Sequence, residues 1–136
     1  MSSRRSRIPT TVLGLTLISR LSAVAVTGPG RDPSTFPDDE KTAGWRDVES
    51  TAEQIRATGR RAMTWTGDVS QPASGERLVD QVMKTFGRID VLVNNAAYPR
   101  GNDRVPLPEL DESVWRKVLD IKLTGAFLLC KRIVPI

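Results

Sequence analysis

The stretch "IDVLVNNAA" (89–97) is the part of the sequence that decides the fold. Three apolar residues, 91–93, follow Asp90, and the asparagine pair Asn94 and Asn95 comes directly after them. A short continuous apolar run is typical of a strand that is covered on both faces in a parallel sheet. Asparagine is a poor strand former. The pair therefore needs a reason other than the strand itself.

The composition is that of one globular domain. The chain has 136 residues, of which 39% are hydrophobic and 26% are charged. The net charge of +4 comes from residues 1–31, which contain five arginines and no acid. The rest of the chain contains 15 basic residues (20 minus 5) and 16 acidic residues, so its net charge is −1. A nucleic-acid-binding protein carries its positive charge on the folded body, so we expect no nucleic-acid partner.

The residue counts exclude several chemistries. The chain contains one cysteine and no histidine. This rules out an internal disulfide, a Cys/His zinc site and a histidine base within these residues. Cys130 lies among apolar residues at helical spacing, which indicates a buried structural thiol.

The N-terminal segment, residues 1–21, is basic, and its apolar face predicts a short helix over 11–21. Its arginines, the apolar run at 12–18 and the small residues at 23–25 are reminiscent of a secretory or transit peptide. Arg20 interrupts that pattern, so a cytoplasmic location is favoured. No apolar run approaches the roughly 18 residues of a membrane span, and no membrane partner is expected.

Periodicity and turn residues predict an alternation of strands and helices from residue 22 onward. The expected elements are a strand over 22–28, a loop over 29–44, a helix over 45–58, a strand over 60–69, a helix over 72–86, a strand over 89–94, a loop over 98–108 and a helix over 111–134. This order predicts an α/β domain over 22–136, a partial doubly wound parallel sheet that is Rossmann-like, in three layers α/β/α. Residues 29–44 are interpreted as an inserted loop.

The apolar residues of each helix fall on one stripe and are expected to face the core. The inward positions are Trp45, Val48, Ala52 and Ile55 in the first of the three later helices, Leu78, Val79, Val82, Met83 and Phe86 in the second, and Val114, Trp115, Val118, Ile121, Ala126 and Leu129 in the last.

Two of the expected strands end in polar signatures, "GDV" (67–69) and "NNAA" (94–97). Alone, each is more typical of a cap on the following helix or loop. Ligands of doubly wound sheets bind beyond the carboxyl ends of the strands. Because both signatures occupy that position on strands expected to lie in one sheet, they indicate a ligand site.

The chain resembles the short-chain dehydrogenases/reductases over residues 45–136. "GRIDVLVNNAA" (87–97) is similar to the family's strand-four signature, "GDV" matches the Asp-Val that closes strand three, and "WRKVLDIKLTGAFLL" (115–129) resembles the helix after strand four, with its Asn-x-x-Gly element. The resemblance implies a Rossmann-like NAD(P)-dependent oxidoreductase that acts on an alcohol/ketone pair.

The resemblance also implies roles for individual residues. Asn94 takes the place of the asparagine that stabilises the central strand near the cofactor's adenosine. Ala96 is the small residue that lets the backbone approach the cofactor, and Asp68 and Val69 occupy the positions that touch the adenine ring. The asparagine pair is thereby explained by its place beside a ligand.

The glycine-rich phosphate loop of the family is the main departure. Its glycines let backbone N–H groups reach the pyrophosphate, whereas here Thr27-Gly28 is followed by "PGRDPSTF" (29–36). In one alignment "VAVTG" (24–28) is strand one with a degenerate loop, and Gly28 contacts the cofactor. In the other it is strand two, and strand one is absent. Parallel strands need a crossover of about a dozen residues, usually helical. Residues 29–44 are expected to contain no helix, which favours the second alignment.

Cofactor preference follows from the end of that strand. An acid there holds the ribose 2′-hydroxyl of NAD, whereas an arginine accommodates the 2′-phosphate of NADP. Arg31 is reached before any acid, which predicts a weak preference for NADP.

The family's catalytic residues are not recognisable in this sequence. Lys122 stands where the family has the asparagine of a proton relay. The family's Ser and Tyr-x-x-x-Lys would follow a further strand, past Ile136, and Tyr98 has Asn102, not a lysine, four residues on. We therefore expect this chain to be catalytically incomplete.

Three roles remain open for the chain. It is an oxidoreductase by descent, whose complete relatives are expected to be homo-oligomers with a small-molecule alcohol/ketone substrate. Alternatively it is a non-catalytic remnant that binds nucleotide or pairs with a homologue, or a gene fragment with no role.

Overall fold

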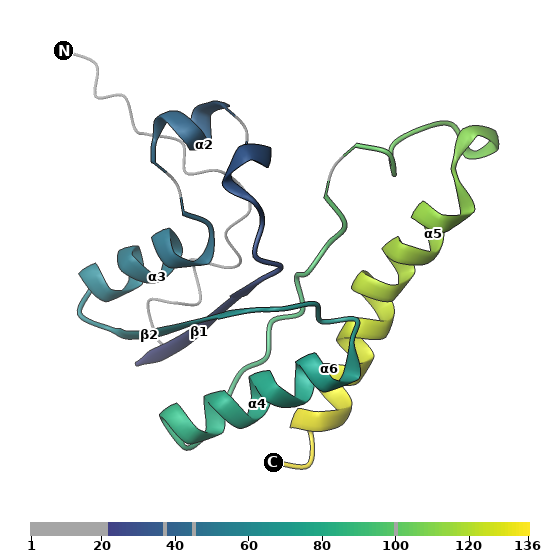
Figure 1. Cartoon of the computed structure of the whole chain (residues 1–136). Coiled ribbons are helices and arrows are strands. Elements are labelled where there is room, and N and C mark those ends of the chain that lie inside the picture. Colours follow the sequence, from purple (N-terminus) through teal and green to yellow (C-terminus); the bar gives the residue numbers. More distant parts are fainter. Residues whose placement is uncertain (1–21, 37, 45, 100) are drawn as a thin grey trace. The chain divides into compact units, whose positions relative to one another are not determined.

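The computed structural model describes residues 22–36, 38–44, 46–99 and 101–136. The chain divides into two compact units (Figure 1). Unit 1 comprises residues up to Val26 and residues 31–64, and unit 2 comprises residues 27–30 and 65–136. The helix expected over 11–21 lies outside the described residues.

The sheet of the described chain has two strands, β1 (Ala23–Gly28) and β2 (Arg61–Thr66). The Arg61 N–H donates to the carbonyl of Ser22 at 3.2 Å, and the Gly67 N–H donates to that of Gly28 at 3.0 Å. Between these two bonds each strand advances by the same six residues, 61 to 67 and 22 to 28, and in the same direction. The strands are therefore parallel.

This pairing bears on the two alignments of "VAVTG". In the doubly wound order 3-2-1-4-5-6, strand three lies beside strand two and not beside strand one. If "GDV" follows strand three, β2 is that strand, and β1, its hydrogen-bonded neighbour, has the place of strand two. The topology thus favours the second alignment. β2 ends at Thr66, so the expectation of a strand through residue 69 was wrong: Gly67, Asp68 and Val69 form the turn that follows.

The expectation that residues 29–44 contain no helix was wrong as well. Unit 1 has a 3-10 turn, η1 (Pro33–Thr35), and a five-residue helix, α2 (Asp38–Thr42). The Asp32 carboxylate accepts from the Ser34 N–H at 2.8 Å and starts η1. The acids at 38–40 occupy the first turn of α2, where they complement the helix dipole.

Helix α3 (Val48–Ala57) begins three residues later than expected. Trp45 lies outside the described residues. The predicted inward residues Ala52 and Ile55 are 0% and 1% exposed, which confirms the apolar stripe. Gly59, at φ +80°, follows the helix in the left-handed conformation that favours glycine after a helix.

Helix α4 (Pro72–Phe86) has the bounds that the sequence predicted. Its proline stands at the start, where the missing N–H costs nothing. Gly87 adopts φ +78° and donates its N–H to the carbonyl of Met83 at 2.8 Å, closing the last turn. Leu78 and Val79 are buried, as expected.

Residues 89–94 do not form the strand that the sequence predicted. A strand exists through hydrogen bonds to a neighbour, and the sheet of the described residues offers this segment none. Ile89 and Leu92 still pack against the core of unit 2. Val91 and Val93 are 45% and 50% exposed, so one face of the segment is open to solvent.

The helix expected over 111–134 is present in three consecutive parts. A 3-10 turn, η2 (Leu107–Glu109), leads into α5 (Glu112–Leu119), a π-helical segment η3 (Asp120–Thr124), and α6 (Gly125–Ile133). Helix α6 packs against α4. Leu78, Val79 and Leu129 form the buried cluster of this packing.

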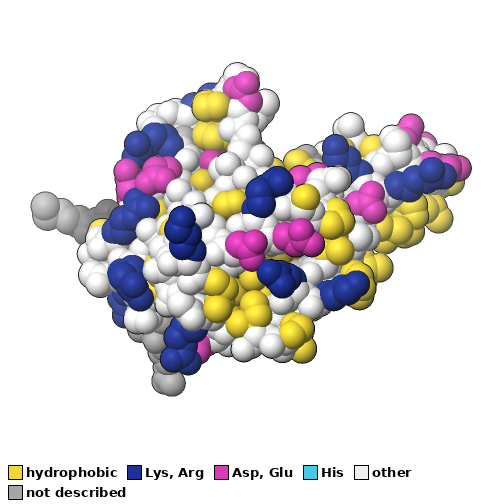
Figure 2. Space-filling model, turned by 60° about the horizontal axis from the view of Figure 1, so that its bottom comes forward, with side chains coloured by type: hydrophobic (Ala, Val, Ile, Leu, Met, Phe, Trp, Pro, Cys, Tyr) yellow, Lys and Arg dark blue, Asp and Glu magenta, His cyan; other side chains and the backbone are white. Residues whose placement is uncertain are grey.

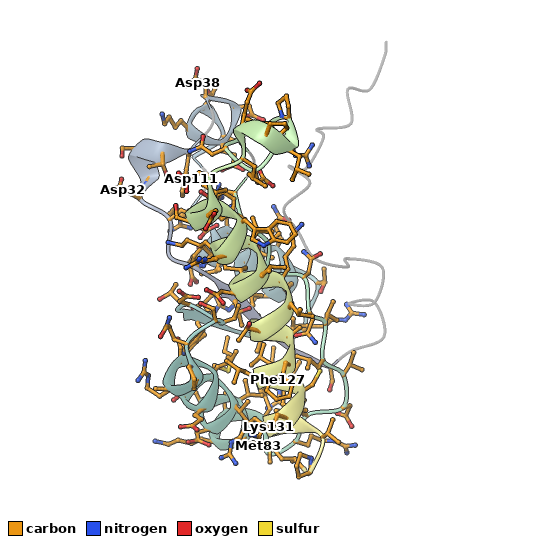
Figure 3. The ribbon with its side chains drawn as sticks, turned by 90° about the vertical axis from the view of Figure 1, so that its right-hand side faces the viewer. Asp32, Asp38, Met83, Asp111, Phe127 and Lys131 are labelled. Carbon is orange, nitrogen blue, oxygen red and sulfur yellow. The ribbon has the colours of Figure 1, made fainter. Side chains whose placement is uncertain are left out.

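Trp115 was wrongly expected to face the core, since it is 49% exposed. It lines a hollow of about 220 Å³ together with Leu107, Leu110 and Glu112. Farther along, Phe127 is 59% exposed and lies 5.8 Å from the Lys131 ammonium (Figure 3). Hydrophobic side chains of this kind are visible on the surface in Figure 2. No helix among the described residues is long and apolar enough to cross a membrane.

Candidate functional site

The turn after β2 carries the first polar signature. The Gly67 N–H reaches back to the Gly28 carbonyl, so the end of β1 and the start of this turn are joined directly. A Cβ on Gly67 would lie 2.2 Å from the Trp65 ring and 2.6 Å from the Ser74 hydroxyl. Only glycine fits there, which fixes the path of the backbone into Asp68.

Asp68 shapes the turn with one of its two carboxylate oxygens. Its Oδ1 accepts from the Ser70 N–H at 2.9 Å and from the Ser70 hydroxyl at 2.6 Å. This is the local hydrogen bonding by which aspartate initiates turns. The Asp68 side chain is exposed. Both hydrogen bonds from Ser70 go to Oδ1, and Oδ2 takes part in neither of these two bonds.

Val69 lies against Gly125, the first residue of α6. A Cβ on Gly125 would come within 2.9 Å of Val69 Cγ2 and 3.2 Å of the Val69 carbonyl oxygen. The glycine therefore lets the turn and the helix meet at backbone distance. Gly125 is the fourth residue of "KLTG" (122–125), which stands where the family has its Asn-x-x-Gly element. That motif could have drawn attention to Gly125, but the sequence did not reveal that the glycine packs against Val69.

The second polar signature is joined to the same helix. Asn94 Nδ2 donates to Cys130 Sγ at 3.4 Å. Cys130 is half-buried, whereas the sequence predicted a buried thiol. Ala96 is exposed two residues beyond Asn94. Helix α6 thus ties both signatures together, through Gly125 to Val69 and through Cys130 to Asn94.

Gly28, Asp68, Val69, Asn94 and Ala96 all belong to unit 2. Lys122 does so too, in the π-helical segment, where it is exposed. The contacts that connect the two signatures to α6 involve Gly125 and Cys130, not Lys122. A π-helical segment is rare and often marks a functional position in a helix.

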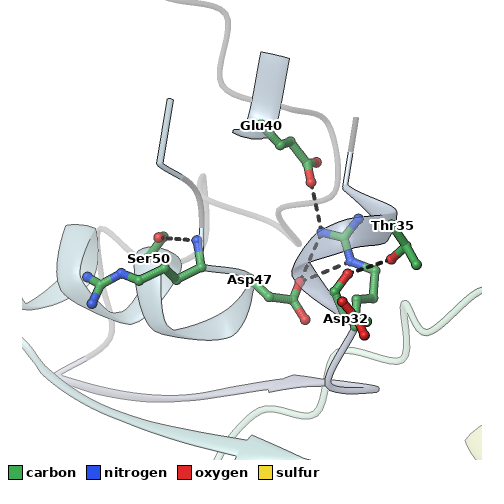
Figure 4. Close-up of polar contacts among 7 residues, drawn as sticks. Asp32, Thr35, Glu40, Asp47 and Ser50 are labelled. Carbon is green, nitrogen blue, oxygen red and sulfur yellow. Dashed lines mark hydrogen bonds and ion pairs between the residues drawn. The ribbon is translucent and has the colours of Figure 1, made fainter. Parts of the chain in front are cut away.

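Arg31 belongs to unit 1 and is engaged there. Its guanidinium donates to Glu40 at 3.1 Å and to Asp47 at 3.0 Å (Figure 4). It also lies 4.6 Å from the centre of the Phe36 ring. These partners lie 5 to 16 positions later in the chain, and no local pattern in the sequence predicted them.

The side chains at these two signatures suit the adenosine part of a dinucleotide better than its pyrophosphate. A carboxylate oxygen at Asp68 can accept from the adenine amino group, and Val69 offers an apolar side chain. A pyrophosphate needs consecutive backbone N–H donors, whereas Pro29 and Pro33 supply none. Among the described residues, no group of three or more acidic, cysteine or histidine side chains could hold a metal ion.

Relatives of the chain are dehydrogenases and reductases. It is 39% identical over 84 residues to cis-4-hydroxycyclohexanecarboxylate dehydrogenase of Sinomonas cyclohexanicum, covering 62% of this chain and 33% of that protein. It is 34% identical over 84 residues to glucose 1-dehydrogenase 2 of Bacillus subtilis (strain 168), covering 62% and 32%. The matched part thus spans about a third of these relatives.

A crystal structure of a short-chain dehydrogenase/reductase from Burkholderia xenovorans superposes with a TM-score of 0.62 at 30% identity, covering 84% of this chain and 48% of that one. The partial α/β, Rossmann-like fold is thereby confirmed. The sequence profile of the family described as short chain dehydrogenase matches residues 43–136. This match covers more than half of the chain, which therefore belongs to the short-chain dehydrogenase/reductase family.

Proposed function

We propose that the chain derives from an NAD(P)-dependent oxidoreductase acting on an alcohol/ketone pair, and that unit 2 carries the contacts of such an enzyme to the adenosine of its cofactor. The observation that supports this proposal is the joining of both polar signatures by α6, Val69 to Gly125 and Asn94 to Cys130. Family membership supplies the class of cofactor.

Each proposed contact has a stated role. Asp68 accepts a hydrogen bond from the adenine amino group, and Val69 packs on the ring. Asn94 orders the backbone beside the adenosine, and the small Ala96 leaves room for the cofactor. Gly28, at the end of β1, would be a counterpart of the family's loop glycines only in the first alignment, which the pairing of β1 with β2 does not favour. A bound nicotinamide would supply the hydride transfer, and these residues would bind and orient the adenosine end of the cofactor.

We propose that the 136 residues alone do not catalyse the reaction. The family's proton transfer uses a tyrosine whose pKa is lowered by a lysine four residues on, and the sequence of this chain holds no such pair. Lys122 is a flexible cation at the position of the relay asparagine and does not replace it. We propose that a complete relative is a cytoplasmic homo-oligomer without a nucleic-acid or membrane partner.

The cofactor is proposed to be NAD(P) with a weak lean to NADP. Arg31 follows Gly28 by three residues and precedes any acid in the sequence. In a complete relative, an Arg31→Ala change is expected to weaken the binding of NADP more than that of NAD. Equal weakening of both would count against a role of Arg31 at the 2′-phosphate.

A second candidate function is a non-catalytic one, pairing with a homologous subunit. Val91 and Val93 are exposed in an extended segment that no strand of the described sheet borders. Such a segment can accept a strand from another chain.

A cofactor titration combined with an activity assay tests the leading proposal. Asp68→Asn keeps an oxygen for Ser70 but turns an amino group toward the adenine amine, setting donor against donor. We expect NADH and NADPH to bind the purified chain without turnover, and Asp68→Asn to weaken binding by about tenfold. The matched change Glu76→Gln, at an exposed carboxylate on α4, leaves binding unchanged. Equal affinity of both variants would exclude Asp68 from the site.

A further inference from the structure

The guanidinium of Arg31 is shared by two carboxylates. Its Nη2 donates to Glu40 Oε2 at 3.1 Å and to Asp47 Oδ1 at 3.0 Å, and its Nε donates to the same Asp47 oxygen at 3.3 Å (Figure 4). One face of the guanidinium lies over the Phe36 ring. Arg31 is therefore held from two directions and stacked from a third.

These partners depend on Arg31 because they are removed from water. Glu40 is 3% exposed and Phe36 is 4% exposed, and the Asp47 side chain retains 19% of its exposure. One positive charge faces two negative charges, so this group of side chains carries a net charge of −1. Asp47 Oδ2 is buried and has no hydrogen-bond partner among the described residues. A buried carboxylate that loses its cation is costly.

The backbone conformation of Asp47 is also unusual. Its φ of +50° is a conformation that few residues other than glycine adopt. The bonds from Arg31 hold the carboxylate of this residue in place. Phe36, Glu40 and Asp47, which lie between β1 and α3, thus all contact one arginine.

We propose that Glu40 and Asp47 are specificity-determining residues, which restrain Arg31 and limit its use for a cofactor 2′-phosphate. The inference rests on the proposed function, in which Arg31 meets that phosphate. A 2′-phosphate can gain the guanidinium only by taking it from a carboxylate, and the net negative charge around Arg31 opposes its approach. A ribose 2′-hydroxyl is uncharged, so it neither has to displace a carboxylate from Arg31 nor is repelled by the negative charge. The two acids thereby keep the lean toward NADP weak.

The test uses the whole chain and two adenine nucleotides, adenosine 2′,5′-bisphosphate and 5′-AMP, with affinities measured by calorimetry. The variants Glu40→Gln and Asp47→Asn each keep an acceptor oxygen for Arg31 and remove one charge. We expect each to raise the affinity for the bisphosphate relative to 5′-AMP by about tenfold. The control Glu53→Gln, at an acid of α3 that pairs with Arg46, leaves the ratio unchanged. Adding Arg31→Gln to either variant abolishes the gain.

The outcomes separate the two proposals. If 5′-AMP binds and the affinity ratio is the same in the wild type, Glu40→Gln and Asp47→Asn, the inference is overturned while nucleotide binding stands. If the ratio rises and Arg31→Gln does not reverse it, Arg31 is not the restrained group. If no protein of the series binds 5′-AMP, the proposed function fails and the inference with it. Two independent variants keep the test valid if one of them does not fold.

Discussion

Val69 and Gly125 meet at backbone distance, with room for no side chain on the glycine. A methyl group at Gly125 would lie 2.9 Å from Val69 Cγ2 and 3.3 Å from the Val69 carbonyl carbon. Ordinary carbon contacts need about 3.5–4.0 Å. The turn that carries "GDV" and the first residue of α6 are therefore positioned by each other.

Gly125→Ala is predicted to destabilise the chain by about 1–3 kcal/mol through this overlap. Gly75→Ala is the matched control, since Gly75 is also buried in a helix but its added Cβ would lie 3.5 Å from Leu129 Cδ2, an ordinary contact. There the higher helix propensity of alanine should stabilise the chain by up to about 1 kcal/mol. Urea unfolding of both variants measures the difference. Equal stability of the two would show that Val69 does not press on Gly125.

Asp111 gives α5 a pH-dependent start. The Ser113 hydroxyl, and with it the Ser113 N–H that donates to Asp111 Oδ1 at 2.7 Å, lowers the pKa of this carboxyl below its ordinary value of 3.8. Figure 3 shows Asp111 at the beginning of the helix. Because the folded pKa is the lower one, the stabilisation is complete above the ordinary Asp pKa and is lost as the pH falls through the folded pKa.

Asp111→Asn is predicted to remove this pH dependence while leaving the helix capped, since asparagine caps as well as aspartate. Hydrogen exchange of the amides at the start of α5, followed from neutral pH into acid, is the measurement. The wild type should lose protection in acid and the variant should not. An identical acid response in both would assign the effect to other carboxyls, of which Asp32 also has a lowered pKa.

The segment 89–93 is predicted to make the isolated chain prone to association. Its apolar side chains Val91 and Val93 are half exposed beside backbone groups that the sheet does not pair. Replacing both by threonine should reduce self-association in size-exclusion chromatography. Val105→Thr, at an exposed valine outside the segment, should not. A monomeric wild type whose 89–93 amides resist hydrogen exchange would show that the segment is paired after all.

Local patterns in the sequence predicted most of the helices. Helix α4 was predicted to the residue because Pro72 and Gly87 mark its ends and its apolar stripe is regular. The strand at 89–94 was predicted wrongly because an apolar run reports burial in a sheet, while a strand also needs neighbours that the run does not encode.

The site was predictable only where a short motif carried it. The sequence singled out "GDV" and "NNAA", and the structure joins both to α6. The sequence did not reveal that Cys130 Sγ accepts a hydrogen bond from Asn94, or that Glu40 and Asp47 form ion pairs with Arg31. Such contacts join residues that are distant in the chain. Trp115 was misplaced because helical spacing identifies an apolar face without saying what covers it.

We propose that unit 2 holds the adenosine contacts of a nicotinamide-dependent enzyme. Titrating the isotope-labelled chain with 5′-AMP and following the backbone amides by NMR tests it most directly. We expect shifts that saturate at Asp68, Val69, Asn94 and Ala96, with smaller changes at Gly125 and Cys130, and no alcohol or ketone turnover when NAD(P) is supplied. Shifts absent from these positions, or cofactor-dependent turnover by the chain alone, would contradict it.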